Sequence, residues 1–190
     1  RVALINWRNT ALDATPAALP GKLKSEVEIF HAERGLCVPD WAANPSFRSI
    51  LRPYLDAYRM VGQEVLLQDA VPVGISLSIS LRVKPEYFQS EVRESARQAL
   101  GMGPGGFFEP GRMRFGEDLH ASDLVQALMA LDGVAHVCVN RFKRIGKQFA
   151  DQTETGRIEL KGLEIAVCDN DPTRPERGYY RLALHGGRLG

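Results

Sequence analysis

The chain has 190 residues, of which 44% are hydrophobic, so it can bury one sizeable hydrophobic core or two small ones. Its 24 Lys and Arg residues almost balance its 23 Asp and Glu residues, which excludes the strongly basic footprint of a nucleic-acid-binding protein at the level of the whole chain. No apolar run approaches the roughly 20 residues that span a bilayer, so we expect no direct membrane insertion. The 3 cysteines form no C-x-x-C pair, a usage typical of a reducing compartment.

The first predicted unit covers residues 1–70 and combines strands with one clear helix. Arg1–Trp7 is expected to be a strand. Because it starts without a methionine, we expect the chain to be the C-terminal part of a longer protein. Glu26–Ala32 fits a short strand or a helix, since its periodicity does not distinguish them. Phe47–Arg59 has apolar residues at helical spacing, and Glu64–Gln68 is expected to follow as a strand.

The second predicted unit covers residues 71–145 and reads strand, helix, loop, helix, strand. Val73–Val83 alternates apolar and polar residues, which predicts a strand with one buried face. A helix is expected from Pro85 to Leu100, because proline suits the first turn of a helix. Ser122 is expected to cap a further helix, and Val134–Phe142 to form the last strand. The side chains expected to be buried together are Ile75, Leu77, Ile79, Leu81, Val92, Ala96 and Leu128.

Three serines, Ser76, Ser78 and Ser80, occupy the polar face of the predicted strand Val73–Val83. Small side chains let another backbone approach closely. This face is therefore expected either to be solvated or to lie close to another chain.

The third predicted unit, residues 146–190, is a C-terminal extension. Gly156–Cys168 and Tyr179–His185 read as strands, and the segment between them is rich in Asp, Asn and Pro, which favours a turn. The sequence therefore predicts a C-terminal β-hairpin. The expected fold class is α+β, with small sheet-plus-helix units, mixed or antiparallel sheets and this hairpin.

The segment Gly101–Gly106 matches the pattern G-x-G-x-x-G. A dinucleotide site needs a strand before this pattern and a helix N-terminus after it. Here the pattern follows a predicted helix and leads into Phe107 and Phe108, so we expect a flexible loop instead. Two phenyl rings on such a loop must be buried, and we expect them to dock on another subunit, with burial against their own sheet as the alternative.

No constellation of residues indicates a reactive or metal-binding centre. Asp169, Asp171 and Glu176 could offer carboxylates to Ca²⁺, but prolines interrupt their spacing and Asx-turn capping is expected instead. The 4 histidines have no partner at metal-ligand spacing. Asp118–Ser122 is expected to shape the start of a helix. We therefore expect no enzyme activity and no cofactor.

Several short motifs follow one another in a distinctive order between Val71 and Asn140. They are Val71-Pro72-Val73, Leu81-Arg82-Val83-Lys84-Pro85, Ala99-Leu100, Phe115-Gly116, Ser122 and Leu131-Asp132-Gly133-Val134. In this order they resemble the baseplate J-like family, the wedge proteins of contractile phage tails and related bacterial injection systems. The segment Asp169–Gly178 is similar to the end of the subgroup of baseplate assembly proteins. The resemblance extends from Phe47 to Leu184.

The resemblance implies a structural subunit of a baseplate wedge, assembled in the bacterial cytoplasm and located in the tail or injection-system baseplate. Its expected partners are a second copy of itself and other wedge, sheath or spike proteins, without nucleic acid. The alternative is a small-molecule-binding or enzymatic α+β domain that uses the Gly101–Gly111 loop. The candidate interface residues are Phe107, Phe108, Phe115, His136, Arg141 and Arg144.

Overall fold

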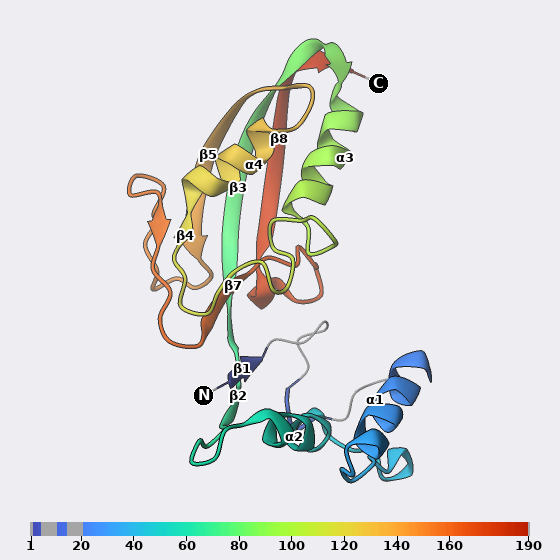
Figure 1. Cartoon of the computed structure of the whole chain (residues 1–190). Coiled ribbons are helices and arrows are strands. Elements are labelled where there is room, and N and C mark those ends of the chain that lie inside the picture. Colours follow the sequence, from blue (N-terminus) through green and yellow to red (C-terminus); the bar gives the residue numbers. More distant parts are fainter. Residues whose placement is uncertain (1, 5–10, 15–20, 190) are drawn as a thin grey trace. The chain divides into compact units, whose positions relative to one another are not determined.

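The structure is a computed structural model that describes residues 2–4, 11–14 and 21–189 (Figure 1). It divides into two compact units, 1–70 and 71–190, so one boundary coincides with that between the first two predicted units. Residues 146–190 do not form a unit of their own, because their strands complete the sheet of the second unit.

Among its described residues, the first unit contains a short two-stranded sheet and two helices. Strand β1 (Val2–Leu4) pairs in parallel with β2 (Leu67–Asp69). Helix α1 (Gly21–Glu33) includes the segment whose periodicity fitted both helix and strand, and η1 (Trp41–Ala43) is a single 3-10 turn. Helix α2 (Phe47–Tyr58) lies where it was expected and tolerates Pro53 in its interior. The rest of the predicted strand Arg1–Trp7 lies outside the described residues.

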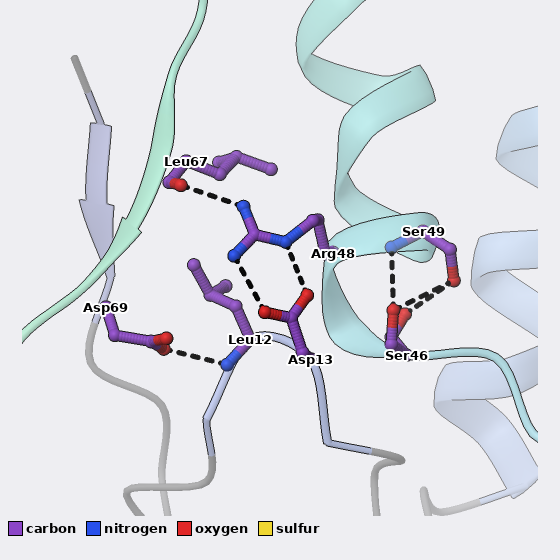
Figure 2. Close-up of polar contacts among 7 residues, drawn as sticks. All are labelled: Leu12, Asp13, Ser46, Arg48, Ser49, Leu67 and Asp69. Atoms are coloured by element: carbon purple, nitrogen blue, oxygen red, sulfur yellow. Dashed lines mark hydrogen bonds and ion pairs between the residues drawn. The ribbon is translucent and has the colours of Figure 1, made fainter.

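The side chain of Arg48 on α2 holds three segments of this unit together (Figure 2). Its guanidinium donates to both carboxylate oxygens of Asp13, at 2.6 and 3.1 Å, and to the backbone oxygen of Leu67 at 2.8 Å. The hydrogen bond from Arg48 holds the pKa of Asp13 below its usual value. The backbone N–H of Leu12 donates to Asp69 at 2.7 Å, which ties the same loop to the end of β2. Ser46 caps α2 by accepting from the N–H of Ser49.

The second unit is built around one long central strand, β3 (Val71–Phe88), which pairs with three others (Figure 1). Strand β5 (Val134–Arg144) runs antiparallel to it. Strand β7 (Glu164–Val167) pairs in parallel with the first residues of β3, and β8 (Tyr179–Arg188) pairs in parallel with the rest. The sheet is therefore mixed, and the unit is α+β as predicted.

The predicted C-terminal hairpin is wrong in its pairing. Strands β7 and β8 both exist, but they run in the same direction, and each pairs with β3 instead of with the other. The segment between them contains η2 (Pro175–Arg177) and is closed by backbone bonds from Asp169 to Arg177 and from Asn170 to Gly178. After β7 the chain leaves the sheet, passes through η2 and then re-enters the sheet as β8, which pairs with β3 as β7 does. The turn residues in this segment therefore belong to a loop between two strands that run in the same direction, and not to a hairpin turn.

Helices α3 (Gln89–Leu100) and α4 (Ala121–Met129) lie on one face of this sheet (Figure 1). The expected core is confirmed: Ile75, Leu77, Ile79 and Leu81 are at most 1% exposed and pack with Val92, Ala96 and Leu128. A small antiparallel pair, β4 (Leu119–His120) with β6 (Arg157–Ile158), adds Leu119 and Ile158 to the same core.

Two expected helix starts are wrong. Pro85 lies within β3, and the helix begins four residues later at Gln89. Val83 is the last residue of β3 that pairs with β5, so the missing N–H of Pro85 removes no hydrogen bond from that ladder. Ser122 does not cap α4, because the helix already begins at Ala121 and the Ser122 hydroxyl donates to Asp123 at 3.3 Å.

Candidate interaction surface

The side chains of β3 alternate between the core and the opposite face of the sheet. Odd-numbered residues from Ile75 to Val83 enter the core beneath α3 and α4. On the opposite face Ser78 and Ser80 are half-buried and Arg82 is exposed. This surface is named the open face here; it comprises the even-numbered residues Ser76–Arg82 and their neighbours on β5 and β8.

The strand register places cationic side chains on both sides of the central serines. Ser78 lies between Arg141 on β5 and Arg181 on β8. Residues directly opposite each other on neighbouring strands have Cβ atoms about 4.5–5.5 Å apart, so this row joins two arginines across one serine. The other three rows are Lys143, Ser76 and Tyr179; Cys138, Ser80 and Ala183; and His136, Arg82 and His185.

The open face carries cations without carboxylates. Residues 76–83, 136–143 and 179–185, which form its strands, include no Asp or Glu. Arg82, Arg141 and Arg181 are exposed, Lys143 is half-buried, and none of the four forms an ion pair with any residue that the structure describes. These four charges have no salt-bridge partner in the described part of the chain, which leaves them available to an anionic partner.

One carboxylate lies at the margin of the open face. Asp151 accepts hydrogen bonds from its neighbour Thr153 and from the backbone N–H of Phe142 on β5. Partial burial opposes its ionisation, but these hydrogen bonds, with a smaller contribution from Arg141, hold the pKa of Asp151 below its usual value. The Asp151 carboxylate is therefore ionised at neutral pH and is held by hydrogen bonds to nearby residues.

A β-bulge shapes the middle of the open face. The pairing shifts between Ser78 and Ile79, so that Asn140 is an extra residue on β5. The Nδ2 of Asn140 donates to the Ser80 hydroxyl at 2.6 Å, and the Cys138 thiol lies 3.4 Å from the Asn140 Oδ1. These two contacts hold the side-chain amide of Asn140 between β5 and β3, next to Arg141.

The η2 segment closes one end of the open face. A Cβ at Gly74 would lie 2.1 Å from the backbone oxygen of Glu176, so this approach requires glycine. Ser76 is only 2% exposed, and its hydroxyl has no hydrogen-bond partner of standard geometry among the described residues. It still lies close enough to the Tyr179 phenol to hold the pKa of Tyr179 below its usual value, helped by the charges of Arg141 and Arg181.

The structure separates the polar members of the predicted interface. His136 and Arg141 are exposed on the open face. Arg144 pairs with Ile75, a core-facing residue, and so belongs to the other side of the sheet. There its Nη2 donates to Glu164 at 2.5 Å, and its guanidinium lies 4.8 Å from the Phe149 ring centroid. Arg144 therefore stabilises the unit instead of offering a free charge.

The prediction that Phe107 and Phe108 dock on another subunit is wrong. Phe107 is 6% exposed and Phe108 is 4% exposed, and both belong to the core of their own unit. The rings meet edge to face at 5.1 Å. Phe115, the third predicted aromatic, is half-buried.

The Gly-rich loop can fold back because its glycines permit close backbone contact. The N–H of Phe107 donates to the oxygen of Ala99 at 2.7 Å, which returns the chain to the end of α3. A Cβ at Gly106 would lie 2.1 Å from the backbone oxygen of Gly101. The loop after α3, which was expected to be flexible, is thus a tight turn that places the rings of Phe107 and Phe108 in the core.

A pocket of about 410 Å³ lies beside this loop. Its walls include Phe107, Arg112 and the carboxylates of Glu117 and Asp123. Asp118, also in the wall, accepts from the backbone N–H of Leu160 at 3.0 Å; that bond, helped by Arg157, holds the pKa of Asp118 below its usual value.

The carboxylates considered for Ca²⁺ serve local structure. Asp171 accepts from the N–H and the hydroxyl of Thr173, the Asx-turn role that was expected. Asp169 forms a two-bond ion pair with Arg177 at the two ends of the η2 excursion. Within residues 2–4, 11–14 and 21–189, no three His, Cys, Asp or Glu side chains are grouped so that they could hold a metal ion.

The sequence was compared with protein families and with curated proteins. No protein-family profile matches the sequence, and no curated protein matches it. In the described part of the chain, no helix is both long enough and apolar enough to cross a membrane.

Proposed function

We propose that this chain is a structural subunit of a contractile-tail baseplate wedge, which associates with a second copy of itself and with other wedge, sheath or spike proteins. The observation that carries the proposal is the open face: a broad, cationic sheet surface with small central side chains and unpaired charges. The order of motifs that resembles the baseplate J-like family indicates the kind of assembly. The proposed location is the baseplate of a phage tail or injection system, assembled in the bacterial cytoplasm.

The form of the open face suits a macromolecular partner better than a small ligand. Small-molecule sites are concave and bury most of their ligand. The open face instead spreads four cations over three strands, with serines where a partner's side chains can enter. Exposed charges arranged in this way steer association and select partners of opposite charge.

Immunoelectron microscopy tests the proposal. Antibodies raised against the chain are applied to contractile-tail particles from cells that carry its gene, with particles from a strain lacking the gene as the control. We expect label at the baseplate end of the tail. Label on no part of the particle, with the chain present in the same cells, would contradict the proposed function.

A second candidate function rests on the pocket beside the Gly101–Gly111 loop. Its volume of about 410 Å³ falls within the range of small-ligand sites, and Glu117, Asp123 and Gln126 supply polar groups to its wall. A screen of small cationic metabolites by thermal shift tests this candidate. A ligand that stabilises the wild type but not the Asp123→Asn variant would support it.

A further inference from the structure

The charges of the second unit are segregated between two sides of its sheet. The open face carries Arg82, Arg141, Lys143 and Arg181, and residues 76–83, 136–143 and 179–185, which form it, include no carboxylate. Residues 89–132, which contain α3, α4 and the loop between them, include 7 Asp and Glu and 4 Lys and Arg, of which Arg93 and Arg97 lie on α3 beside Glu91 and Glu94. The net charge of +1 for the whole chain therefore conceals one basic and one acidic side.

The acidic side presents its carboxylates to solvent. Glu91 and Glu94 on α3 and Asp132 after α4 are exposed, and none of them forms an ion pair with a described residue. Glu94 lies midway between the buried residues Val92 and Ala96, so it points away from the core. The helical layer of one molecule is thus complementary in charge to the open face of another.

We propose that the open face of one copy binds the acidic helical layer of a second copy. The two surfaces are different, so the contact is heterologous and each bound copy leaves one of each surface free. Repetition of such a contact closes into a ring if the rotation between copies allows it, and otherwise gives an open array. The inference rests on the self-association in the proposed function and names the surfaces that would make it.

The composition of the open face favours a protein partner over a nucleic acid. Surfaces that bind single strands combine cations with exposed aromatic rings on which bases stack. The aromatic residue of the open face is Tyr179, which is half-buried beside Ser76. The column Ser78–Ser80 offers small hydroxyls instead, against which an acidic helix can pack closely.

A charge-swap experiment on the whole 190-residue chain tests this arrangement. One variant reverses the open face (Arg141→Glu with Arg181→Glu), and the other reverses the helical layer (Glu94→Arg with Asp132→Arg). The matched control, Lys147→Glu with Lys161→Glu, makes the same net charge change as the first variant but on exposed residues outside the open face. Mass is measured by light scattering and sedimentation over a range of concentrations and salt.

We expect the wild type and the control to self-associate, and the wild-type association to weaken at least about tenfold when salt rises from about 0.05 to 0.3 M. Each reversal variant alone should self-associate much more weakly than the wild type, because the two substitutions cancel the net charge of one of its two complementary surfaces. An equimolar mixture of the two variants should associate again, since the unchanged open face of the helical-layer variant can bind the unchanged helical layer of the open-face variant. The milder variant Arg141→Gln with Arg181→Gln should weaken self-association without abolishing folding, and circular dichroism checks the fold of every variant.

Three results would overturn the proposal. If the helical-layer variant alone associates as the wild type does, the helices are not the partner surface. If both folded reversal variants associate like the control, neither surface is involved. The third result is a wild type that stays monomeric but binds a random single-stranded oligonucleotide, with the binding lost when the open face is reversed. In that case the open face is a nucleic-acid-binding surface. Because immunoelectron microscopy does not depend on these variants, failure of this contact and failure of the baseplate proposal can be told apart.

Discussion

Truncation of Phe107 and Phe108 separates a core role of these rings from a role at an interface. Phe107→Ala and Phe108→Ala each remove a ring that is at least nine-tenths buried. Such changes typically destabilise a domain by about 3–5 kcal/mol, from lost transfer free energy and the cavity left behind. The edge-to-face contact between the rings adds about 0.5–1.5 kcal/mol, which both single variants lose.

Urea unfolding followed by circular dichroism measures these losses. Tryptophan fluorescence is unsuitable, because Trp7 and Trp41 both belong to the first unit. We expect each variant to shift the unfolding of the second unit to lower urea at unchanged slope. The double variant should lose less than the sum of the single losses, since the ring pair is counted in both.

A loss below about 1 kcal/mol for both single variants, with self-association abolished, would refute the core assignment. In that case the rings would belong to a surface contact, as the sequence alone suggested. Gly103→Ala, in the same loop, is the control, because an added Cβ there meets no atom within 4 Å.

The other predictions concern the central strand and one ion pair. Ile79→Ala, at a fully buried position, should lower the free energy of unfolding by about 2–5 kcal/mol in the same urea assay, and a loss below about 1 kcal/mol would place β3 at an edge. Gly74→Ala should destabilise by about 1–3 kcal/mol through its clash with the backbone of η2, whereas Gly103→Ala should stay within about 0.5 kcal/mol; equal effects would contradict the close approach. The hydrogen bond from Arg144 holds the pKa of Glu164 below its ordinary value of 4.5, so its stabilisation is complete above pH 4.5 and is lost as pH falls through the lower folded value. Glu164→Gln should therefore flatten the acid limb of a plot of melting temperature against pH, and an unchanged limb would show that the pair adds nothing.

Local patterns predicted the core well because burial follows periodicity. The alternation from Ile75 to Leu81 identified the buried face of β3, and the helical spacing of Val92 and Ala96 identified the face of α3 that covers it. The same patterns misplaced the start of α3. Proline is compatible both with the first turn of a helix and with the part of a strand that has no hydrogen-bonded neighbour. Which of the two applies to Pro85 depends on where the pairing of β3 with β5 ends, and this is not visible in the local sequence.

Pairing between distant strands could not be predicted, and the candidate site depends on it. Turn residues between β7 and β8 indicate that the chain bends, but not which strand it rejoins. Arg82, Lys143 and Arg181 are far apart in sequence and share one face only through the register of β3 with β5 and β8. Ser76, Ser78 and Ser80 were the only local feature of the sequence that indicated this face. Their small side chains did not predict that cationic side chains lie beside them on β5 and β8.

The position of β3 in the sheet also sets the order in which the unit can form during translation. Ser76 on β3 pairs with Tyr179 on β8, which is synthesised about one hundred residues later, so β8 can pair with β3 only after that delay. At typical elongation rates of about 5–20 residues per second, the ribosome takes roughly 5–20 s to supply that partner. During this interval β3 exposes an edge with strongly apolar alternation, a substrate for chaperones and a risk of aggregation. Arg181 also arrives with β8, so the complete cationic surface exists only after synthesis of this unit, which delays its association with other molecules.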